Sequence, residues 1–151
     1  MGIRIKGTGM FVPEKTLTNA DLEKMVETSD EWITTRTGIK VRHIADKQTA
    51  TSDLAAAAAR KALEMAGVEP SELDLITVAT VTPDKLFPNT AALVQRKLGA
   101  CTCPCFDLEA ACSGLIYSIE VAHSLMAANK KYKKALVIGA EKLSSIVDWT
   151  D

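Results

Sequence analysis

The sequence predicts an α/β domain whose strands form a mainly parallel sheet with helices on both faces. Short apolar runs typical of buried strands alternate along the chain with longer helical patterns. The helical patterns begin at residues that commonly cap helices, and several of them end at glycine. Because parallel strands are joined by crossover connections, helices between strands favour a parallel sheet and one domain over residues 1–151.

The first part of the chain is predicted to hold one strand and three helices. Apolar and charged residues alternate at the start of the chain, which is typical of a half-buried strand. A signal peptide would instead need an uninterrupted apolar core. In chain order, the predicted elements are a strand over residues 3–9, a helix over 20–27 capped by Asn19, a short helix from Ser29 or Asp30 to Gly38, and a helix from Thr51 or Ser52 to Gly67.

The second part is predicted to hold three strands and two helices. Its strands are short continuous apolar runs, as expected for strands covered on both faces. In chain order, the predicted elements are a strand over residues 73–81, a helix from Asn89 or Thr90 to Gly99, a strand over 104–109, a helix from Cys112 to about Asn129, and a strand over 135–140.

The last of these helices is apolar around most of its circumference, with Glu120 and His123 as its main polar interruptions. A helix with this pattern is buried on all sides. One sheet covers only one side of a helix, so we expect a further layer, outside this chain, to cover the other side. The apolar positions are Leu115, Ile116, Tyr117, Ile119, Val121, Ala122, Leu125 and Met126.

The composition is that of an ordinary soluble globular protein, with 47% hydrophobic and 25% charged residues. The net charge of −1 gives no basic footprint for nucleic acid and no polybasic patch for a membrane surface. No apolar run is expected to reach membrane-spanning length. We therefore expect a cytoplasmic protein with neither nucleic acid nor membrane as a partner.

The segment around Cys112 is the strongest candidate for a catalytic site. A predicted strand ends in small residues, Cys112 follows, and a long helix begins. The positive end of the helix dipole favours a thiolate at such a position, and small neighbours leave room for a substrate carbonyl. We interpret Cys112 as the nucleophile of an acyl-transferring enzyme, although the local pattern also fits a small buried thiol without a catalytic role.

A cysteine nucleophile usually works with a histidine or another base within hydrogen-bond reach. The chain offers only His43 and His123. His123 lies eleven positions beyond Cys112 on the same predicted helix, about 16 Å away at the helical rise, and His43 lies in a polar, loop-like stretch. We therefore expect the acid–base partners of Cys112 outside these residues.

The other cysteines, Cys101, Cys103 and Cys105, alternate along a predicted sheet segment. Neither a tetrahedral metal site nor an unstrained disulfide forms easily between residues two apart on a strand. None of the familiar zinc-binding spacings is present. We predict small packed thiols and no metal site, and a redox role for this cluster remains a distant alternative.

Several motifs closely resemble the amino-terminal half of β-ketoacyl-acyl-carrier-protein synthase III. The most specific is the block Ser29-Asp30-Glu31-Trp32-Ile33 followed by Arg36-Thr37-Gly38-Ile39. The segment 107–114 resembles the nucleophile turn of that family, which its thiolase relatives share. The resemblance extends over essentially the whole chain. The other matching stretches are residues 18–26, Arg42-His43-Ile44-Ala45, Phe87-Pro88 and Leu136 to Glu141.

The resemblance implies a thiolase-like fold, in which two similar α/β halves form a five-layer αβαβα sandwich and this chain is the first half. The nucleophile helix would then lie in the middle layer. The family carries its catalytic histidine and asparagine on the second half, which implies that Cys112 works with residues absent from this chain. One donor for the oxyanion would be the N–H of Cys112 itself.

The resemblance also implies an acyl-coenzyme A site, with coenzyme A as a substrate and no cofactor. Thr28, Trp32 and Arg36 are spaced four apart and would share one face of a continuous helix. Tryptophan offers a stacking surface for adenine and arginine a fork for phosphate, and the family uses Trp32 and Arg36 in this way. The family's counterpart of Phe87 reaches the acyl pocket of the partner subunit, which implies a homodimer.

The implied reaction starts fatty acid synthesis. Cys112 takes an acetyl or short acyl group from coenzyme A, and decarboxylation of malonyl-acyl-carrier protein then yields 3-ketoacyl-carrier protein. Two alternatives stay open: a polyketide-priming or hydroxymethylglutaryl-type synthase of the same superfamily, and a non-catalytic fragment that binds coenzyme A or dimerises. We expect this chain alone not to complete condensation. The sequence does not fix the length or branching of the acyl chain.

Overall fold

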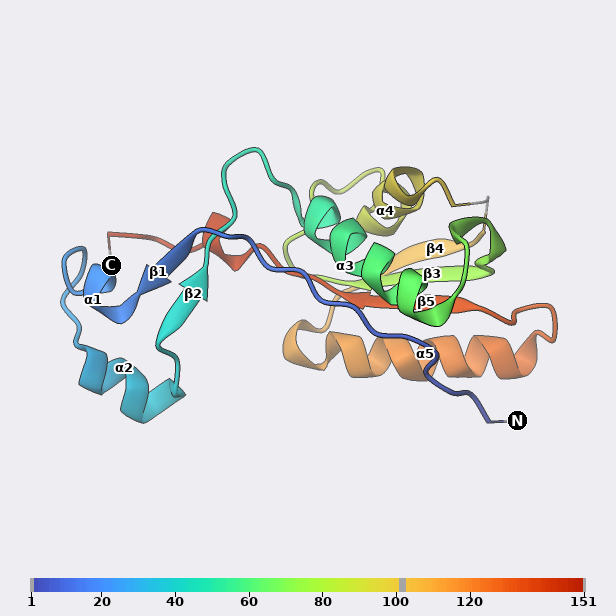
Figure 1. Ribbon diagram of the computed structural model, residues 1–151, viewed down its shortest axis with the longest axis horizontal. Coiled ribbons are helices and arrows are strands. Elements are labelled where there is room, and N and C mark those ends of the chain that lie inside the picture. The colour runs from blue at the N-terminus through green and yellow to red at the C-terminus, as the bar shows by residue number, and fades with distance from the viewer. Residues whose placement is uncertain (1, 101–102, 151) are drawn as a thin grey trace. The chain divides into compact units, whose positions relative to one another are not determined.

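The computed structural model describes residues 2–100 and 103–150 (Figure 1). The chain divides into two compact units, which we describe separately. The first unit contains residues 2–11 and 50–141, and the second contains residues 12–49 and 142–150. Two compact units can still belong to one domain, so the expectation of a single domain over residues 1–151 stays a prediction.

A three-stranded sheet forms the centre of the first unit. Its strands are β3 (Leu75–Ala79), β4 (Cys105–Leu108) and β5 (Ala135–Gly139), in the order β4-β3-β5. Both neighbours of β3 run parallel to it. All five residues of β3 are buried, as its continuous apolar sequence predicts. The predicted parallel sheet is therefore confirmed.

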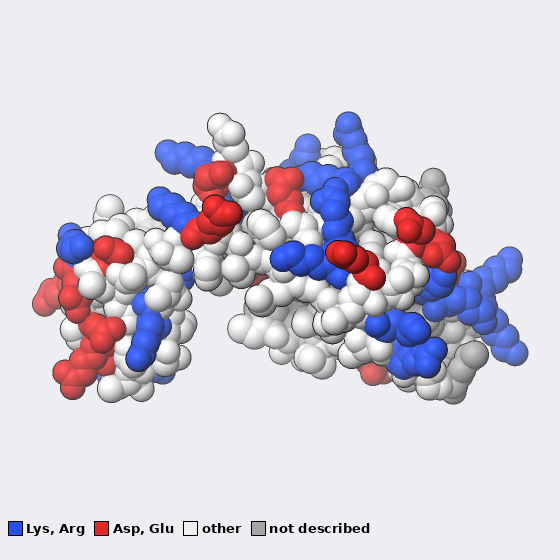
Figure 2. All heavy atoms as spheres, viewed as in Figure 1, with Lys and Arg blue, Asp and Glu red and all other residues white. Residues whose placement is uncertain are grey.

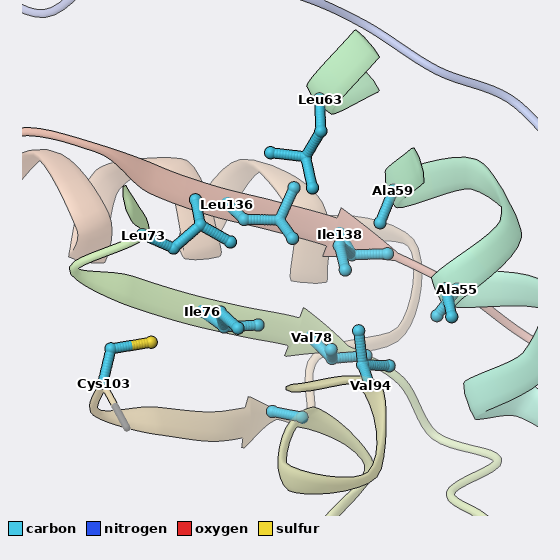
Figure 3. Packing of buried hydrophobic residues seen from close by; sticks show 12 residues of the cluster. Ala55, Ala59, Leu63, Leu73, Ile76, Val78, Val94, Cys103, Leu136 and Ile138 are labelled. Atoms are coloured by element: carbon cyan, nitrogen blue, oxygen red, sulfur yellow. The ribbon is translucent and has the colours of Figure 1, made fainter. Parts of the chain in front are cut away.

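Helices cover both faces of this sheet (Figure 1). The helices α3 (Thr51–Ala66) and α4 (Thr90–Leu98) lie on one face, and α5 (Gly114–Ala128) lies on the other. Figure 3 shows apolar side chains from α3, α4, β3 and β5 meeting between the first face and its helices. The labelled members of this core are Ala55, Ala59, Leu63, Leu73, Ile76, Val78, Val94, Cys103, Leu136 and Ile138.

The helix α5 approaches β3 closely along a stripe of small buried residues, Gly114, Ser118 and Ala122, each one turn apart. A Cβ atom on Gly114 would lie only 2.9 Å from the Cβ of Ala79. On the first turns of α5, Leu115, Ile116 and Tyr117 are exposed, and Figure 2 shows few charged side chains there. Within the described chain, α5 is therefore covered on one side only.

By length and composition, residues 111–128 form a helix that could cross a membrane. This differs from the sequence expectation that no run reaches that length. The same test is passed by core helices of soluble proteins. In the described chain, only 17% of this window is buried, and α5 packs against β3 and β5 on one side.

The strand predicted over residues 3–9 is not formed. Residues 2–11 belong to neither a helix nor a strand. Gly7 and Gly9 lie so close to α3 that a Cβ on either would be within 2.4 Å of a backbone oxygen, that of Ala62 or Ala58. A strand needs a hydrogen-bonding neighbour, and in the described chain this segment packs on a helix instead of pairing with the sheet.

The second unit contains two short helices and a two-stranded antiparallel sheet. Strands β1 (Thr16–Thr18) and β2 (Val41–His43) pair with Leu17 opposite Arg42. The helices are α1 (Asn19–Leu22) and α2 (Asp30–Thr37). Sequence reasoning missed both strands, because three residues are too few to show an alternating pattern.

The helix ends agree with the sequence in part. Ser29 caps α2 and Asn89 caps α4, while Gly38, Gly67 and Gly99 end α2, α3 and α4 with positive φ angles, as predicted. Two predicted starts were wrong: Thr18 rather than Asn19 caps α1, and a 3₁₀ turn over Ala111–Ser113 precedes α5. The start of α3 at Thr51 agrees with the sequence, although Ala50 takes the cap position without a side-chain hydrogen bond.

The cap of α1 predicts a response to acid. Asp21 accepts hydrogen bonds from the backbone N–H of Thr18 at 3.1 Å and from its hydroxyl at 2.6 Å. These bonds and the nearby Lys24 lower the pKa of Asp21 from 3.8 to about 2. The cap is thus fully formed above the unfolded pKa near 3.8 and is lost as pH falls through about 2. An NMR titration of the Thr18 amide would follow this transition, and Asp21→Asn should remove it.

Candidate functional site

Cys112 lies on a sharp bend between a strand and a helix, as the sequence predicts. Strand β4 ends at Leu108, Cys112 occupies the middle of the 3₁₀ turn, and α5 begins two residues later. The side chain of Cys112 is exposed. The thiol is therefore open to solvent at the amino-terminal end of a helix, where backbone N–H groups and the helix dipole favour negative charge.

The backbone at this bend adopts an unusual conformation. Ala111 has φ +44°, and it is the one described non-glycine residue with positive φ. For an alanine this region costs roughly 1–2 kcal/mol. The turn that presents Cys112 is thus held in a strained conformation, which is common at functional sites.

This strain gives a prediction for Ala111. Ala111→Gly should stabilise the fold by about 1 kcal/mol, because glycine adopts positive φ without the Cβ clash. Ala111→Val should destabilise it, because a β-branched side chain fits this region poorly. Chemical denaturation of the two variants beside the wild type would measure both effects. Equal stabilities of the glycine and valine variants would contradict the assignment of strain to this residue.

Two carboxylates organise the carboxyl ends of the strands near this bend. Asp107, the third residue of β4, accepts the N–H groups of Thr90 and Ala91 at 2.7 Å each and so binds the start of α4. Glu141, just after β5, accepts the N–H of Val81 at 2.9 Å and the hydroxyl of Thr82 at 2.5 Å. Neither residue is recognisable from the sequence alone, because these contacts form only once the strands lie side by side.

Only one of the two histidines is placed as the sequence suggests, because His43, expected in a loop-like stretch, lies in a strand. His123 lies within α5, about 16 Å along the helix from Cys112. His43 lies in β2 of the second unit, where its Nδ1 is 2.6 Å from the carbonyl oxygen of Pro13. The helical separation excludes direct contact between His123 and Cys112. The expectation that the acid–base partners lie outside this chain stays a prediction.

The remaining cysteines have structural environments. The side-chain amide of Gln95 donates to the carbonyl of Cys103 at 2.8 Å, and the Cys105 thiol lies 3.9 Å from the Gln95 side-chain oxygen. Burial, with a contribution from Asp107, raises the pKa of the Cys105 thiol. Cys101 lies outside the described residues. Within residues 2–100 and 103–150, no three His, Cys, Asp or Glu side chains are grouped to hold a metal ion.

In the second unit, Trp32 and Arg36 come together on α2. The Trp32 side chain is 54% exposed, and the guanidinium carbon of Arg36 lies 4.8 Å from the centroid of its ring. This is a cation–π arrangement. Trp32 also lines a shallow hollow of about 210 Å³ with Glu27, Thr28 and Ser29. A flat surface, a guanidinium and a small hollow are thus grouped on one element.

Thr28 lies outside the helix on which the sequence spacing had placed it together with Trp32 and Arg36. Because α2 begins at Asp30, Thr28 does not continue the helical face of Trp32 and Arg36. Thr28 nevertheless reaches the same hollow, from the turn that precedes the helix. Glu27 and Ser29 line it as well and were not predicted. Only the path of the turn, which sequence spacing does not define, brings them there.

Phe87 lies in the segment between β3 and α4 and is 88% exposed, and its neighbour Leu86 is 95% exposed. Together, these two neighbours present apolar surface to solvent. Phe87 is not part of the described apolar core.

Comparisons with known proteins support the resemblance found in the sequence. A family model for 3-oxoacyl-[acyl-carrier-protein] synthase III matches residues 106–151. A curated β-ketoacyl-[acyl-carrier-protein] synthase III from Caldanaerobacter subterraneus is 57% identical, with 97% of this chain and 44% of the relative covered. That from Aquifex aeolicus is 56% identical, with 100% of this chain and 48% of the relative covered.

Solved structures of similar proteins give the same result as the sequence relatives. The crystal structure of 3-oxoacyl-[acyl-carrier-protein] synthase III from Aquifex aeolicus superposes with a TM-score of 0.94 at 55% identity, covering 99% of this chain and 48% of that one. A priming β-ketosynthase of the R1128 polyketide pathway gives a TM-score of 0.90 at 32% identity, covering 98% and 44%. The chain spans less than half the length of these relatives. Its resemblance to the amino-terminal half of such a synthase and its α/β layered fold are confirmed.

Proposed function

We propose that this chain is the nucleophile-bearing half of a β-ketoacyl-acyl-carrier-protein synthase III, an acyltransferase that starts fatty acid synthesis in the cytoplasm. The observation that carries this proposal is the exposed Cys112 at a strained bend before α5. It occurs in a chain that is similar over nearly its whole length to such synthases.

The first half-reaction uses the residues around Cys112. The thiolate attacks the thioester carbonyl of acetyl-coenzyme A, the tetrahedral oxyanion is stabilised by backbone N–H donors, and the coenzyme A thiolate leaves. The product is an acetyl thioester on Cys112. Small neighbours and the start of α5 leave the sulfur accessible for this step.

The second half-reaction needs more than this chain provides. Malonyl-acyl-carrier protein loses carbon dioxide, and the carbanion attacks the acetyl carbon, which gives 3-ketoacyl-carrier protein and frees the thiolate. Neutralising the developing charge calls for a histidine and a further donor, which the resemblance assigns to the second half of the protein. We propose that condensation depends on residues outside this chain.

Trp32, Arg36 and Thr28 are proposed to bind coenzyme A. The adenine ring stacks on the indole of Trp32, Arg36 pairs with phosphate, and Thr28 lines the hollow beside them. Phe87 is proposed to contact a second copy of the chain and its acyl pocket, as its exposure allows.

A polyketide-priming synthase is the second candidate, because one such enzyme shares the fold with a TM-score of 0.90. Its identity to this chain, 32%, is well below the 55% of the fatty-acid initiating enzyme from Aquifex aeolicus. The sequence therefore favours the fatty-acid enzyme.

Intact-protein mass after incubation with acetyl-coenzyme A tests the proposal. We expect one acetyl adduct per chain and no ketoacyl product when malonyl-acyl-carrier protein is added. The absence of an adduct on folded protein would overturn the proposed first half-reaction for this chain. A ketoacyl product from protein verified to end at Asp151 would overturn the dependence of condensation on a second half.

The coenzyme site predicts the effect of removing Trp32. Trp32→Ala should weaken coenzyme A binding by roughly tenfold or more, because a stacking surface and its cation–π partner are lost. Isothermal titration would measure it. The matched control is Trp149→Ala in the same unit, whose indole N–H donates to the carbonyl of Ser144 at 3.2 Å. Equal losses in the two variants would contradict the assignment of Trp32 to the binding site.

A further inference from the structure

We infer that Ser52, Asp84 and Lys97 are positioning residues that fix residues 83–88, named here the Phe87 loop, in the conformation that presents Phe87. The importance of that conformation rests on the proposed function, in which Phe87 contacts a second copy of the chain. The anchoring itself is independent of that function and can be measured separately.

The Phe87 loop combines high exposure with fixed ends. Leu86 and Phe87 are almost fully exposed, so their own side chains contribute little to holding the loop. A loop of this kind would ordinarily be mobile, and ordering it during association would cost free energy. The bonds that fix it must therefore come from its flanks.

Asp84 attaches the loop to the start of α3. One oxygen of its carboxylate accepts the backbone N–H of Ser52 at 2.8 Å, and the other accepts the Ser52 hydroxyl. The N–H of Ser52 belongs to the first turn of α3, where backbone donors lack helical partners and favour a carboxylate. Asp84 thus caps α3 from a position 32 residues away in the sequence.

Lys97 completes the anchor from the end of α4. Its ammonium donates to the Ser52 hydroxyl at 2.6 Å and to Asp53 at 2.5 Å. The Lys97 carbonyl in turn accepts the guanidinium of Arg60, on α3, at 2.5 Å. The Ser52 hydroxyl therefore joins a cation on α4 to the carboxylate on the loop.

Hydrogen bonds also fix the residues just before and just after the loop. The hydroxyl of Thr51 donates to the carbonyl of Thr82 at 2.5 Å, just before the loop. Just after it, Asn89 caps α4 by accepting the N–H of Ala92 at 2.8 Å. Between these points Pro83, Lys85, Leu86 and Phe87 are exposed.

A serine between a lysine and an aspartate could also suggest a second nucleophile. Ser52 is fully buried, with 0% of its surface exposed, so no substrate reaches its hydroxyl. The same burial makes its two hydrogen bonds costly to remove. The geometry therefore supports a positioning role and not a second catalytic site.

Trypsin provides a local probe, because the bond after exposed Lys85 lies within the loop. Ser52→Ala leaves the cleaved sequence unchanged and removes the hydroxyl that joins Asp84 and Lys97. We expect cleavage after Lys85 to accelerate by roughly tenfold, with cleavage at other sites unchanged. Ser118→Ala is the matched control, because Ser118 is also fully buried and its hydroxyl has no hydrogen-bond partner in the described chain. Lys97→Met tests the same anchor from the side of α4.

Sedimentation of the same variants tests the consequence for association. We expect Ser52→Ala and Phe87→Ala to weaken self-association and Ser118→Ala to leave it unchanged. Equal cleavage after Lys85 in Ser52→Ala and Ser118→Ala, or acceleration at every site, would overturn the anchor. A released loop with unchanged self-association would overturn its link to Phe87. A monomeric wild type that resists cleavage after Lys85 would overturn the proposed dimer and leave the anchor standing.

Discussion

Cys112→Ser is expected to abolish the acetyl adduct, with the rate of acylation by acetyl-coenzyme A falling by more than about 100-fold. Serine preserves the size of the side chain and the bend around it, so the change isolates the chemistry of the sulfur. A hydroxyl without an adjacent base is a poor nucleophile, whereas a cysteine reacts through its thiolate. Time-resolved intact mass of both proteins would measure the difference.

The other cysteines provide the control. A variant with Cys101, Cys103 and Cys105 all replaced by serine retains Cys112 alone and should form the adduct at the wild-type rate. Cys103 is buried, and burial raises the pKa of the Cys105 thiol, so we expect these two to react slowly. An adduct that persists in Cys112→Ser and disappears in the triple variant would contradict the assignment of the nucleophile.

The sequence predicted the central sheet and the position of the nucleophile because both depend on local patterns. A continuous apolar run specifies a strand buried on both faces, and β3 is buried throughout. A glycine beyond each helix specifies where α2, α3 and α4 end. The bend at Cys112 follows from a strand and a helix separated by small residues, and no long-range information is needed to place it.

The sequence predictions were wrong where strand pairing or contacts between distant residues determine the structure. The segment 3–9 has the alternation of a strand, but no strand of the described chain pairs with it, so it packs on α3. Asn19 has the chemistry of a cap, yet its side chain is used elsewhere and Thr18 caps α1. The capping of α3 by Asp84 joins residues 32 positions apart, which single-sequence reasoning does not reveal.

In the candidate coenzyme site, too, the sequence predicts what local spacing determines and does not predict what distant contacts determine. The spacing of Trp32 and Arg36 correctly places them together, and the structure stacks the guanidinium on the indole. The hollow beside them depends on the turn before α2, which brings in Glu27 and Ser29. The position of α2 depends in turn on Asn19, a residue whose role the sequence analysis did not recognise.

Asn19 is the buried centre of the second unit. It is 2% exposed, and its side-chain nitrogen lies 2.6 Å from the Asp30 carboxylate and 2.9 Å from the carbonyl of Ile39. Its side-chain oxygen accepts the guanidinium of Arg42. One amide thus joins α1 to the start of α2, to the chain after α2 and to β2. Its nitrogen bonds a carboxylate, that of Asp30, and its oxygen bonds a guanidinium, that of Arg42.

Asn19→Ala should therefore destabilise the second unit by about 1–3 kcal/mol, because the exposed Asp30 and the partly buried Arg42 both lose a hydrogen bond to a buried amide. Because Asp30 is the first residue of α2, the same change should loosen the helix that carries Trp32 and Arg36 and weaken coenzyme A binding. Denaturation and calorimetric titration measure the two effects.

Asn89→Ala is the matched control, since it removes an asparagine that caps a helix in the first unit and should cost only about 1 kcal/mol. If Asn19→Ala costs no more than this cap, the amide is not the centre of the unit. If stability falls while coenzyme A binding is unchanged, the position of α2 does not depend on Asn19. A loss of both would connect the burial of one amide to the binding surface, through the hydrogen bonds of Asn19 to both ends of α2.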